Sequence, residues 1–126
     1  MYNEAKFNTA FNKWLKYNWL DSGKFELKIT KGKSIPFAAV KLHQELALLN
    51  SKVIYKIPDV GQDPKPFDCF CMKDIKGYVV IMFYRRGQKD FYMFEITDWM
   101  FLKNTHFRKS ITEPIANKFG IKYTLK

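Results

Sequence analysis

The sequence has little of what disulfide-built proteins and zinc-binding proteins require. Its 126 residues include only two cysteines, six glycines and five prolines. Cys69 and Cys71 lie two positions apart on one predicted strand, where a mutual disulfide would be strained. His43 and His106 are not clustered with them, so no zinc site is expected and both cysteines are predicted to be core thiols.

Long apolar segments are also missing. The longest uninterrupted apolar run extends from Tyr78 to Tyr84, far short of the ~20 residues of a membrane-spanning helix. The first residues show no secretory signal pattern, so we expect a soluble cytoplasmic protein, of the host-cell cytoplasm if the source is viral. Hydrophobic residues make up 47% of the chain and aromatic residues 17%, which excludes intrinsic disorder and predicts one domain over residues 1–126.

Acidic residues are scarce relative to basic residues. The chain has 22 lysines and arginines against 12 aspartates and glutamates, a net charge of +10. This excess favours a polyanionic partner, and nucleic acid before a membrane because no basic amphipathic helix stands out. Predicted loops and the tail hold the basic residues that we expect to bind phosphates: Lys31, Lys33, Arg85, Arg86, Lys89, Arg108 and Lys109.

Hydrophobic periodicity predicts a mixed α/β domain, with helices covering a central mixed sheet. Apolar residues at helical spacing after the capping residue Asn3 predict a helix over residues 4–17. Strict alternation predicts a half-buried strand over 25–30, and Ser34 before a proline predicts the start of a second helix over 35–49.

The second half of the chain is predicted to be rich in strands. Strands are expected over residues 67–72, 78–84 and 91–97, joined by loops of hairpin length, with the apolar middle strand at the centre of the sheet. The remaining segments are expected to form a loop over a sheet edge at 50–66, one helical turn at 98–102 and a short helix at 114–119.

Candidate chemistry begins with Glu26 and Lys28. Two positions apart on a strand, a carboxylate and an ammonium group point the same way and can meet one phosphate or metal-bound water. A divalent ion needs a second carboxylate, and Asp68 lies at the start of a predicted strand amid apolar residues. If the two strands are neighbours, both acids would hold Mg²⁺ while Lys28 offsets charge on the scissile phosphate. The alternatives are a solvated cross-strand pair and, for Asp68, a turn acid.

Gln44 and Glu4 are further polar candidates. Gln44 shares a largely apolar helix face with Val40 and Leu48, one turn to either side, where its amide needs a partner. It is otherwise a surface glutamine at the boundary of the core. Glu4 is equally well explained as an acid in the first turn that complements the helix dipole.

These residues together resemble the PD-(D/E)XK superfamily of nucleases. The pattern comprises Glu4 in the first helix, Phe25-Glu26-Leu27-Lys28 on a strand, a basic loop, and His43-Gln44 in the following helix. It is most similar to the bacterial and phage Holliday junction resolvases of that superfamily, and the resemblance extends over residues 4–96.

The resemblance implies a restriction-endonuclease-like fold and an endonuclease that depends on Mg²⁺, with Mn²⁺ as a substitute. It implies that Glu26 is a metal ligand, Lys28 the catalytic lysine, and Gln44 and Glu4 residues near the active centre. It also implies branched DNA, such as a four-way junction, as the substrate. Because a junction is resolved by two cuts, we expect a homodimer, with these aromatic residues as candidates for its interface: Trp14, Trp19, Trp99 and Phe101.

The chain departs from the superfamily pattern in its second metal-binding acid. Members carry that acid on the strand before the E-x-K strand, whereas Asp21 lies too close to Glu26 for a hairpin. We expect Asp68 to replace it from a later strand, with Asp59 as the second choice. The competing hypotheses are a non-catalytic basic nucleic-acid-binding module on a nuclease-like scaffold, and a structural or inhibitory protein whose acids are incidental.

Overall fold

The computed structural model describes residues 2–18, 23–50, 52–57, 69–106 and 108–125, and for 52–57 and 69–74 it describes the backbone alone. The elements in chain order are α1 (Glu4–Asn18), β1 (Gly23–Thr30), β2 (Ser34–Pro36), the 3₁₀ turn η1 (Phe37–Ala39), α2 (Leu42–Leu49), β3 (Lys52–Ile57), β4 (Cys69–Asp74), β5 (Lys76–Phe83), β6 (Asp90–Glu95), α3 (Ile96–Thr105), β7 (Ser110–Thr112), α4 (Glu113–Phe119) and β8 (Ile121–Thr124). Within these ranges, no helix combines the length and apolar character that crossing a membrane requires.

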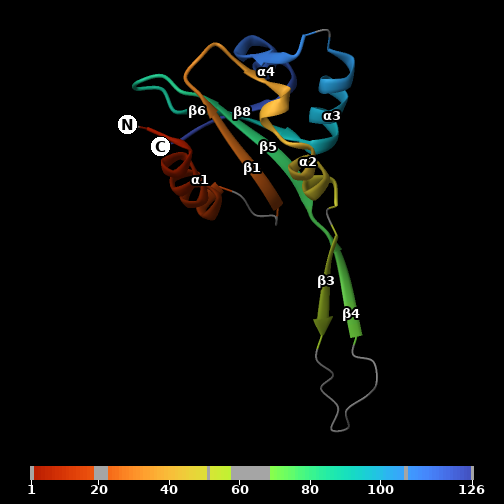
Figure 1. The fold of residues 1–126 in the computed structure, drawn as a ribbon. Coiled ribbons are helices and arrows are strands. Elements are labelled where there is room, and N and C mark those ends of the chain that lie inside the picture. The colour runs from red at the N-terminus through yellow and green to blue at the C-terminus, as the bar shows by residue number, and fades with distance from the viewer. Residues whose placement is uncertain (1, 19–22, 51, 58–68, 107, 126) are drawn as a thin grey trace.

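A four-stranded mixed sheet in the order β1-β5-β6-β8 forms the centre of the molecule (Figure 1). β1 runs parallel to β5, whereas β6 pairs antiparallel with both β5 and β8. The predicted mixed α/β domain is therefore confirmed, as is the central place of the apolar strand, because β5 lies between β1 and β6. The predicted hairpin between the strands now identified as β5 and β6 is confirmed as well.

Helices cover both faces of this sheet. On one face, called the α1 face, Phe7 and Phe11 of α1 are fully buried against Val80 and Phe91. On the other, called the α2 face, residues of α2, α3 and α4 pack around the fully buried Trp99. Alternate side chains of β5 enter the two cores, which explains why this strand is apolar at almost every position.

α1 and β1 agree with their predictions. The side chain of Asn3 accepts a hydrogen bond from the backbone N–H of Lys6 at 3.0 Å, so it caps α1 as expected. In β1, Leu27 is buried on the α1 face, where Phe25 and Ile29 pack beside it. The alternation read from the sequence therefore places Glu26, Lys28 and Thr30 on the α2 face.

The helix predicted over residues 35–49 is wrong in its first half. Ser34–Pro36 forms β2, which pairs antiparallel with β7, and the α-helix begins only at Leu42. Ile35 lies opposite Ile111 and both are buried, so strand pairing stabilises this segment more than a proline-started helix would. Pro36 itself is extended, with ψ at 142°.

The loop predicted over residues 50–66 and the hairpin predicted at 73–77 are also wrong. Lys52–Ile57 is a strand, β3, and it pairs antiparallel with β4. β4 continues past Ile75 into β5 in one direction, because β4 takes β3 as its partner and does not fold back on β5. β3 and β4 form a two-stranded arm that extends away from the central sheet (Figure 1).

The C-terminal third is more regular than the sequence predicts. The single helical turn expected at 98–102 is part of α3, a helix of ten residues that buries Trp99 and Leu102. The short helix expected at 114–119 is confirmed as α4. β7 and β8 were not predicted, since three- and four-residue strands contain too few positions to show a period.

Gly77 allows the end of α2 to lie against β5, and this contact is testable. An alanine Cβ at this position would overlap the backbone of Leu48, so Gly77→Ala should destabilise the fold by about 1–3 kcal/mol in urea unfolding. Gly32→Ala is the matched control, because the nearest atom to its Cβ is 3.6 Å away. Equal stability of the two variants would contradict the close packing of α2 on β5.

Candidate functional site

The candidate site lies on β1 at one edge of the sheet. Among the strands that the structure describes, β5 is its only neighbour. In the parallel register Glu26 lies beside Val79 and Lys28 beside Ile81, and both of these β5 residues are buried in the core of the α2 face. Glu26 and Lys28 therefore project toward α2. The other edge of their strand pairs with no strand among the described residues.

Glu26, Lys28 and Gln44 meet in one polar cluster. Lys28 Nζ lies 3.3 Å from Glu26 Oε1, and Gln44 Nε2 donates a hydrogen bond of 3.0 Å to the same oxygen. The side chains of Glu26 and Lys28 retain 26% and 16% of their exposure, so they are accessible but partly desolvated. No described residue donates to Glu26 Oε2, which leaves that oxygen available for a ligand.

The backbone fixes the orientation of the Gln44 amide. Its Oε1 accepts the N–H of Lys41, the residue before α2, at 2.9 Å. With the oxygen held at the start of the helix, the amide NH₂ is directed to Glu26. The expectation that this amide needs a partner is confirmed, because Gln44 completes a helix cap with one end and binds the carboxylate with the other.

Glu45, the next residue, is a polar group that sequence reasoning missed. It is 0% exposed, accepts a hydrogen bond from Trp99 Nε1 at 3.1 Å, and pairs with Lys103 Nζ at 2.9 Å. These contacts fasten α2 to α3 and hold the helix that carries Gln44. Hydropathy conceals this role, because α2 buries its glutamate while exposing the apolar side chains of Leu42, Leu46 and Leu49.

Glu4 approaches the same strand from the α1 face. Together with Ala5 and Asn8 of α1, it lines a shallow hollow of about 300 Å³ at the edge of β1. The hollow is also lined by Glu26 and its neighbours Phe25 and Leu27, so Glu4 lies near the strand that carries Glu26, while the Glu26 carboxylate itself is held by Lys28 and Gln44. Carboxylate oxygens are the ligands that Mg²⁺ prefers, and a neighbouring lysine suits a phosphate bound to that ion.

The structure does not describe the second metal-binding acid. Asp68, Asp59 and Asp21 all lie outside the described residues. The strand expected to bring Asp68 beside Glu26 is elsewhere, since β4 pairs with β3 and β5 occupies the place beside β1. Within the described ranges, no group of three or more histidine, cysteine, aspartate or glutamate residues could hold a metal ion. Glu26, with one oxygen that no described residue contacts, suits Mg²⁺ in chemistry, and Glu4 lines the hollow beside it.

Four of the seven basic residues that were expected to bind phosphates lie at one end of the sheet. Lys31 and Lys33 follow β1, and Arg85 and Arg86 follow β5, so parallel pairing brings the two loops side by side. The backbone N–H of Tyr84 donates to the carbonyl of Thr30 at 2.7 Å and ties these strand ends together.

Lys89 does not join this group. Its ammonium lies 5.8 Å from the ring centre of Tyr2, and its side chain lines a different hollow, with Lys13 and Trp14 of α1. In the other basic loop, Arg108 is exposed and the carbonyl of Lys109 accepts the N–H of Phe37. The basic residues therefore form one compact group at the ends of β1 and β5, while Lys89 and the loop of Arg108 and Lys109 lie apart from it.

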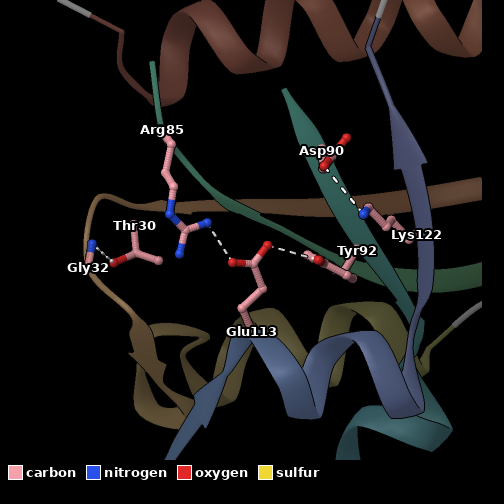
Figure 2. A network of polar contacts seen from close by, with 7 residues as sticks. All are labelled: Thr30, Gly32, Arg85, Asp90, Tyr92, Glu113 and Lys122. Atoms are coloured by element: carbon pink, nitrogen blue, oxygen red, sulfur yellow. Dashed lines mark hydrogen bonds and ion pairs between the residues drawn. The ribbon is translucent and has the colours of Figure 1, made fainter. Parts of the chain in front are cut away.

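Arg85 is anchored by a hydrogen-bonded chain that sequence reasoning did not foresee. Its Nη1 lies 2.5 Å from Glu113 Oε1, while the hydroxyl of Tyr92 donates to Glu113 Oε2 at 2.9 Å (Figure 2). Burial, with the hydrogen bond to Glu113, raises the pKa of Tyr92 to about 12. The hydroxyl therefore keeps its proton at neutral pH and remains a donor.

The four aromatic residues expected at a dimer interface have four different outcomes. The prediction for Trp99 is wrong, because its side chain is fully buried and its Nε1 donates a hydrogen bond to Glu45. Trp14 is half-buried and stacks within the aromatic core of the α1 face, and Trp19 lies outside the described residues. Phe101 on α3 is 69% exposed, as an interface residue should be.

The buried contact of Glu45 yields a stability prediction. Lys103→Met leaves a buried carboxylate with Trp99 as its only described partner, so the variant should lose about 3 kcal/mol of unfolding free energy, measured in urea. Lys118→Met is the control, because Lys118 is exposed on α4 and pairs with no described acid. A loss no larger than that of the control would show that the pair contributes nothing.

Comparisons with protein-family models, with curated proteins and with solved structures find no match to this chain. The geometry of Glu26, Lys28 and Gln44 on the edge strand is therefore the basis on which its function is argued.

Proposed function

We propose that the chain is a Mg²⁺-dependent DNA endonuclease with a restriction-endonuclease-like fold, selective for branched DNA such as a four-way junction. The observation that carries the proposal is the meeting of Glu26, Lys28 and Gln44 at one carboxylate oxygen. Glu26 and Lys28 meet because they are two positions apart on one strand, whereas Gln44 reaches the same oxygen from a helix, so its approach is a tertiary contact.

Each residue has a definite part in the proposed hydrolysis. Glu26 binds the metal through the carboxylate oxygen that no described residue contacts, and Glu4 is the nearby acid of α1 that lines the hollow at the edge of β1. Lys28 stabilises the negative charge that develops on the phosphate as water attacks the phosphorus and the P–O bond breaks. Gln44 keeps the Glu26 carboxylate in place. The ion, when bound, supplies polarisation of the phosphate and a lowered pKa for the attacking water.

Two surfaces support DNA as the substrate. The basic loops after β1 and β5 lie beyond the C-terminal ends of the strands that flank the cluster, where they are placed to neutralise backbone phosphates. The β3-β4 arm is a two-stranded ribbon, an element that fits a nucleic-acid groove or the open centre of a branch (Figure 1). Selectivity for branched DNA is attributed to this arm.

A non-catalytic nucleic-acid-binding module on the same scaffold is the second candidate. It is favoured by one observation, that Lys28 already lies 3.3 Å from Glu26 and balances its charge without a metal. Both candidates bind DNA, and only the first one cleaves it in the presence of Mg²⁺.

Cleavage of a labelled four-way junction tests the choice between them. We expect symmetrical nicks near the branch point with Mg²⁺ and none with EDTA, and less cutting of linear duplex and single strands. Glu26→Gln and Lys28→Ala should each lower the cleavage rate by about 10²-fold or more while DNA binding is retained.

Glu95→Gln is the matched control for that experiment. It removes the same charge from β6, on the α1 face and away from Gln44, and should cleave at the wild-type rate. Tight junction binding without cleavage in either Mg²⁺ or Mn²⁺ would reject the endonuclease and leave the binding module.

The proposed reaction also calls for a homodimer, since two opposed strands must be cut. The exposed leucines of α2, Leu42, Leu46 and Leu49, offer an apolar surface. Over such a surface, two copies of a chain with a net charge of +10 meet without opposing their lysines. Because α2 also carries Gln44, pairing through it brings the two candidate sites toward each other.

Sedimentation of the purified protein tests this interface. Wild type should sediment as a dimer, and Leu46→Lys should shift it to a monomer by placing charge within the apolar surface. Tyr17→Lys is the control, because Tyr17 is also an exposed apolar residue, at 73% against 54% for Leu46, but lies on α1. A wild-type monomer, or a dimer unaffected by Leu46→Lys, would reject this surface.

A further inference from the structure

A second hollow lies on the α2 face of the sheet, apart from the Glu26 cluster. It has a volume of about 500 Å³, and its polar lining contains more positive than negative charge: Lys33, Arg85, Lys122, Glu113, Tyr92 and Asn117. Tyr92 lies beside Ile81 of β5, which in turn lies beside Lys28 of β1. The registers therefore place this hollow and the Glu26 cluster on the same face of one sheet.

The cations of this hollow differ in how they are held. Lys33 pairs with no acid among the described residues, and Lys122 lies 3.5 Å from Asp90. Arg85 binds Glu113 through Nη1 alone, so the rest of its guanidinium fork is not used by that ion pair. Glu113 is saturated in turn, with Arg85 on one oxygen and the Tyr92 hydroxyl on the other (Figure 2).

The main effect of this ion pair is to orient the Arg85 guanidinium, because only one of its nitrogens contacts Glu113. A carboxylate held at both oxygens cannot follow a moving side chain, so it fixes the direction of the guanidinium plane. The loop that carries Lys33 is fixed as well, because Thr30 Oγ1 accepts the N–H of Gly32 at 3.1 Å. In the other loop, between β5 and β6, Gly87 follows Arg86 and allows the chain to turn with a φ of 82°.

We propose that this hollow is a phosphate-binding subsite, in which Arg85 contacts a backbone phosphate of the nucleic acid and Glu113 and Tyr92 are positioning residues. The inference rests on the proposed nucleic-acid binding and specifies Arg85 as one of the residues that contact the phosphate backbone. From Glu26 to Thr30 along β1 is about 13 Å at ~3.3 Å per residue. Arg85 follows the end of β5 that lies beside Thr30, so the phosphate that it contacts is one other than the scissile phosphate.

Binding in EDTA tests the subsite without requiring cleavage. The dissociation constant of a labelled junction is measured across a salt series for wild type, Arg85→Ala and Arg85→Lys. Arg85→Ala should weaken binding about tenfold and lower the salt slope by about one. Arg85→Lys keeps the charge but not the fork, so it should restore the slope and only part of the affinity.

Two matched variants separate a built site from general electrostatics. Arg86→Ala removes the same charge one position away, outside the hollow, and should weaken binding less than Arg85→Ala. Glu113→Gln removes a negative charge, which general electrostatics predicts to tighten binding; the subsite predicts about threefold weaker binding, because Arg85 loses its anchor. Tighter binding by Glu113→Gln, or equal losses for the two arginines, would overturn the proposal.

A final arm identifies the source of the phosphate. The side-chain N–H resonances of Arg85 are followed while inorganic phosphate or the junction is added at constant ionic strength. Shifts with the junction that are absent in Arg85→Ala support the subsite. Saturation by millimolar phosphate alone, with junction affinity unchanged in Arg85→Ala, would assign the hollow to a free anion and overturn it. If wild type binds no nucleic acid at all, the proposed function fails; if it binds without using Arg85, only the subsite fails.

Discussion

The parallel pairing of β1 with β5 is the constraint on which the rest of the structure depends. It places Glu26 and Lys28 on the same face as the buried Val79 and Ile81, and so beneath α2. It also sends both strands out of the sheet at the same end, where their following loops must be neighbours. One register therefore creates both the carboxylate cluster and the basic surface beside it. A shift by one residue would turn Glu26 into the aromatic core of the α1 face.

Two glutamates with fixed partners, Glu45 and Glu113, hold in place the elements that surround this pair of strands. Glu45 fixes α2 against α3 from inside the core, and Glu113 fixes the basic turn against α4 near the surface. In both cases a carboxylate is shared between one cation and one neutral aromatic donor, Trp99 or Tyr92. The neutral donor satisfies the second oxygen without adding charge, so each acid is held in one orientation at a low electrostatic cost. Neither acid takes part in the proposed hydrolysis, yet each determines where a functional side chain points.

The elements that could be predicted from the sequence are those whose burial follows a clear period. α1, β1 and β5 show it, and the partner of Gln44 was expected because an amide on an apolar helix face needs one. The first half of the helix predicted over residues 35–49 was wrong because Ile35 pairs with a strand far along the chain, which no local pattern reveals, while its second half is α2. The roles of Glu45 and Glu113 were missed for the same reason. A charged residue in a helix is expected to be exposed, and only its tertiary partner shows otherwise.

The edge position of β1 connects the chemistry to the shape of the substrate. A carboxylate on an interior strand would have neighbouring strands on both sides, whereas β1 has only β5 beside it among the described strands, and Glu26 lies at this edge with its side chain toward α2. A long polyanion can therefore lie along the strand without entering a deep cavity, with the basic loops beyond the end of β1 and the β3-β4 arm extending from β5 (Figure 1). Small substrates would leave both of those elements unused. The separation of the Glu26 cluster from the basic loops, which follow the far ends of β1 and β5, therefore suits the proposed nucleic-acid substrate, a polymer with repeated phosphates, better than a small molecule.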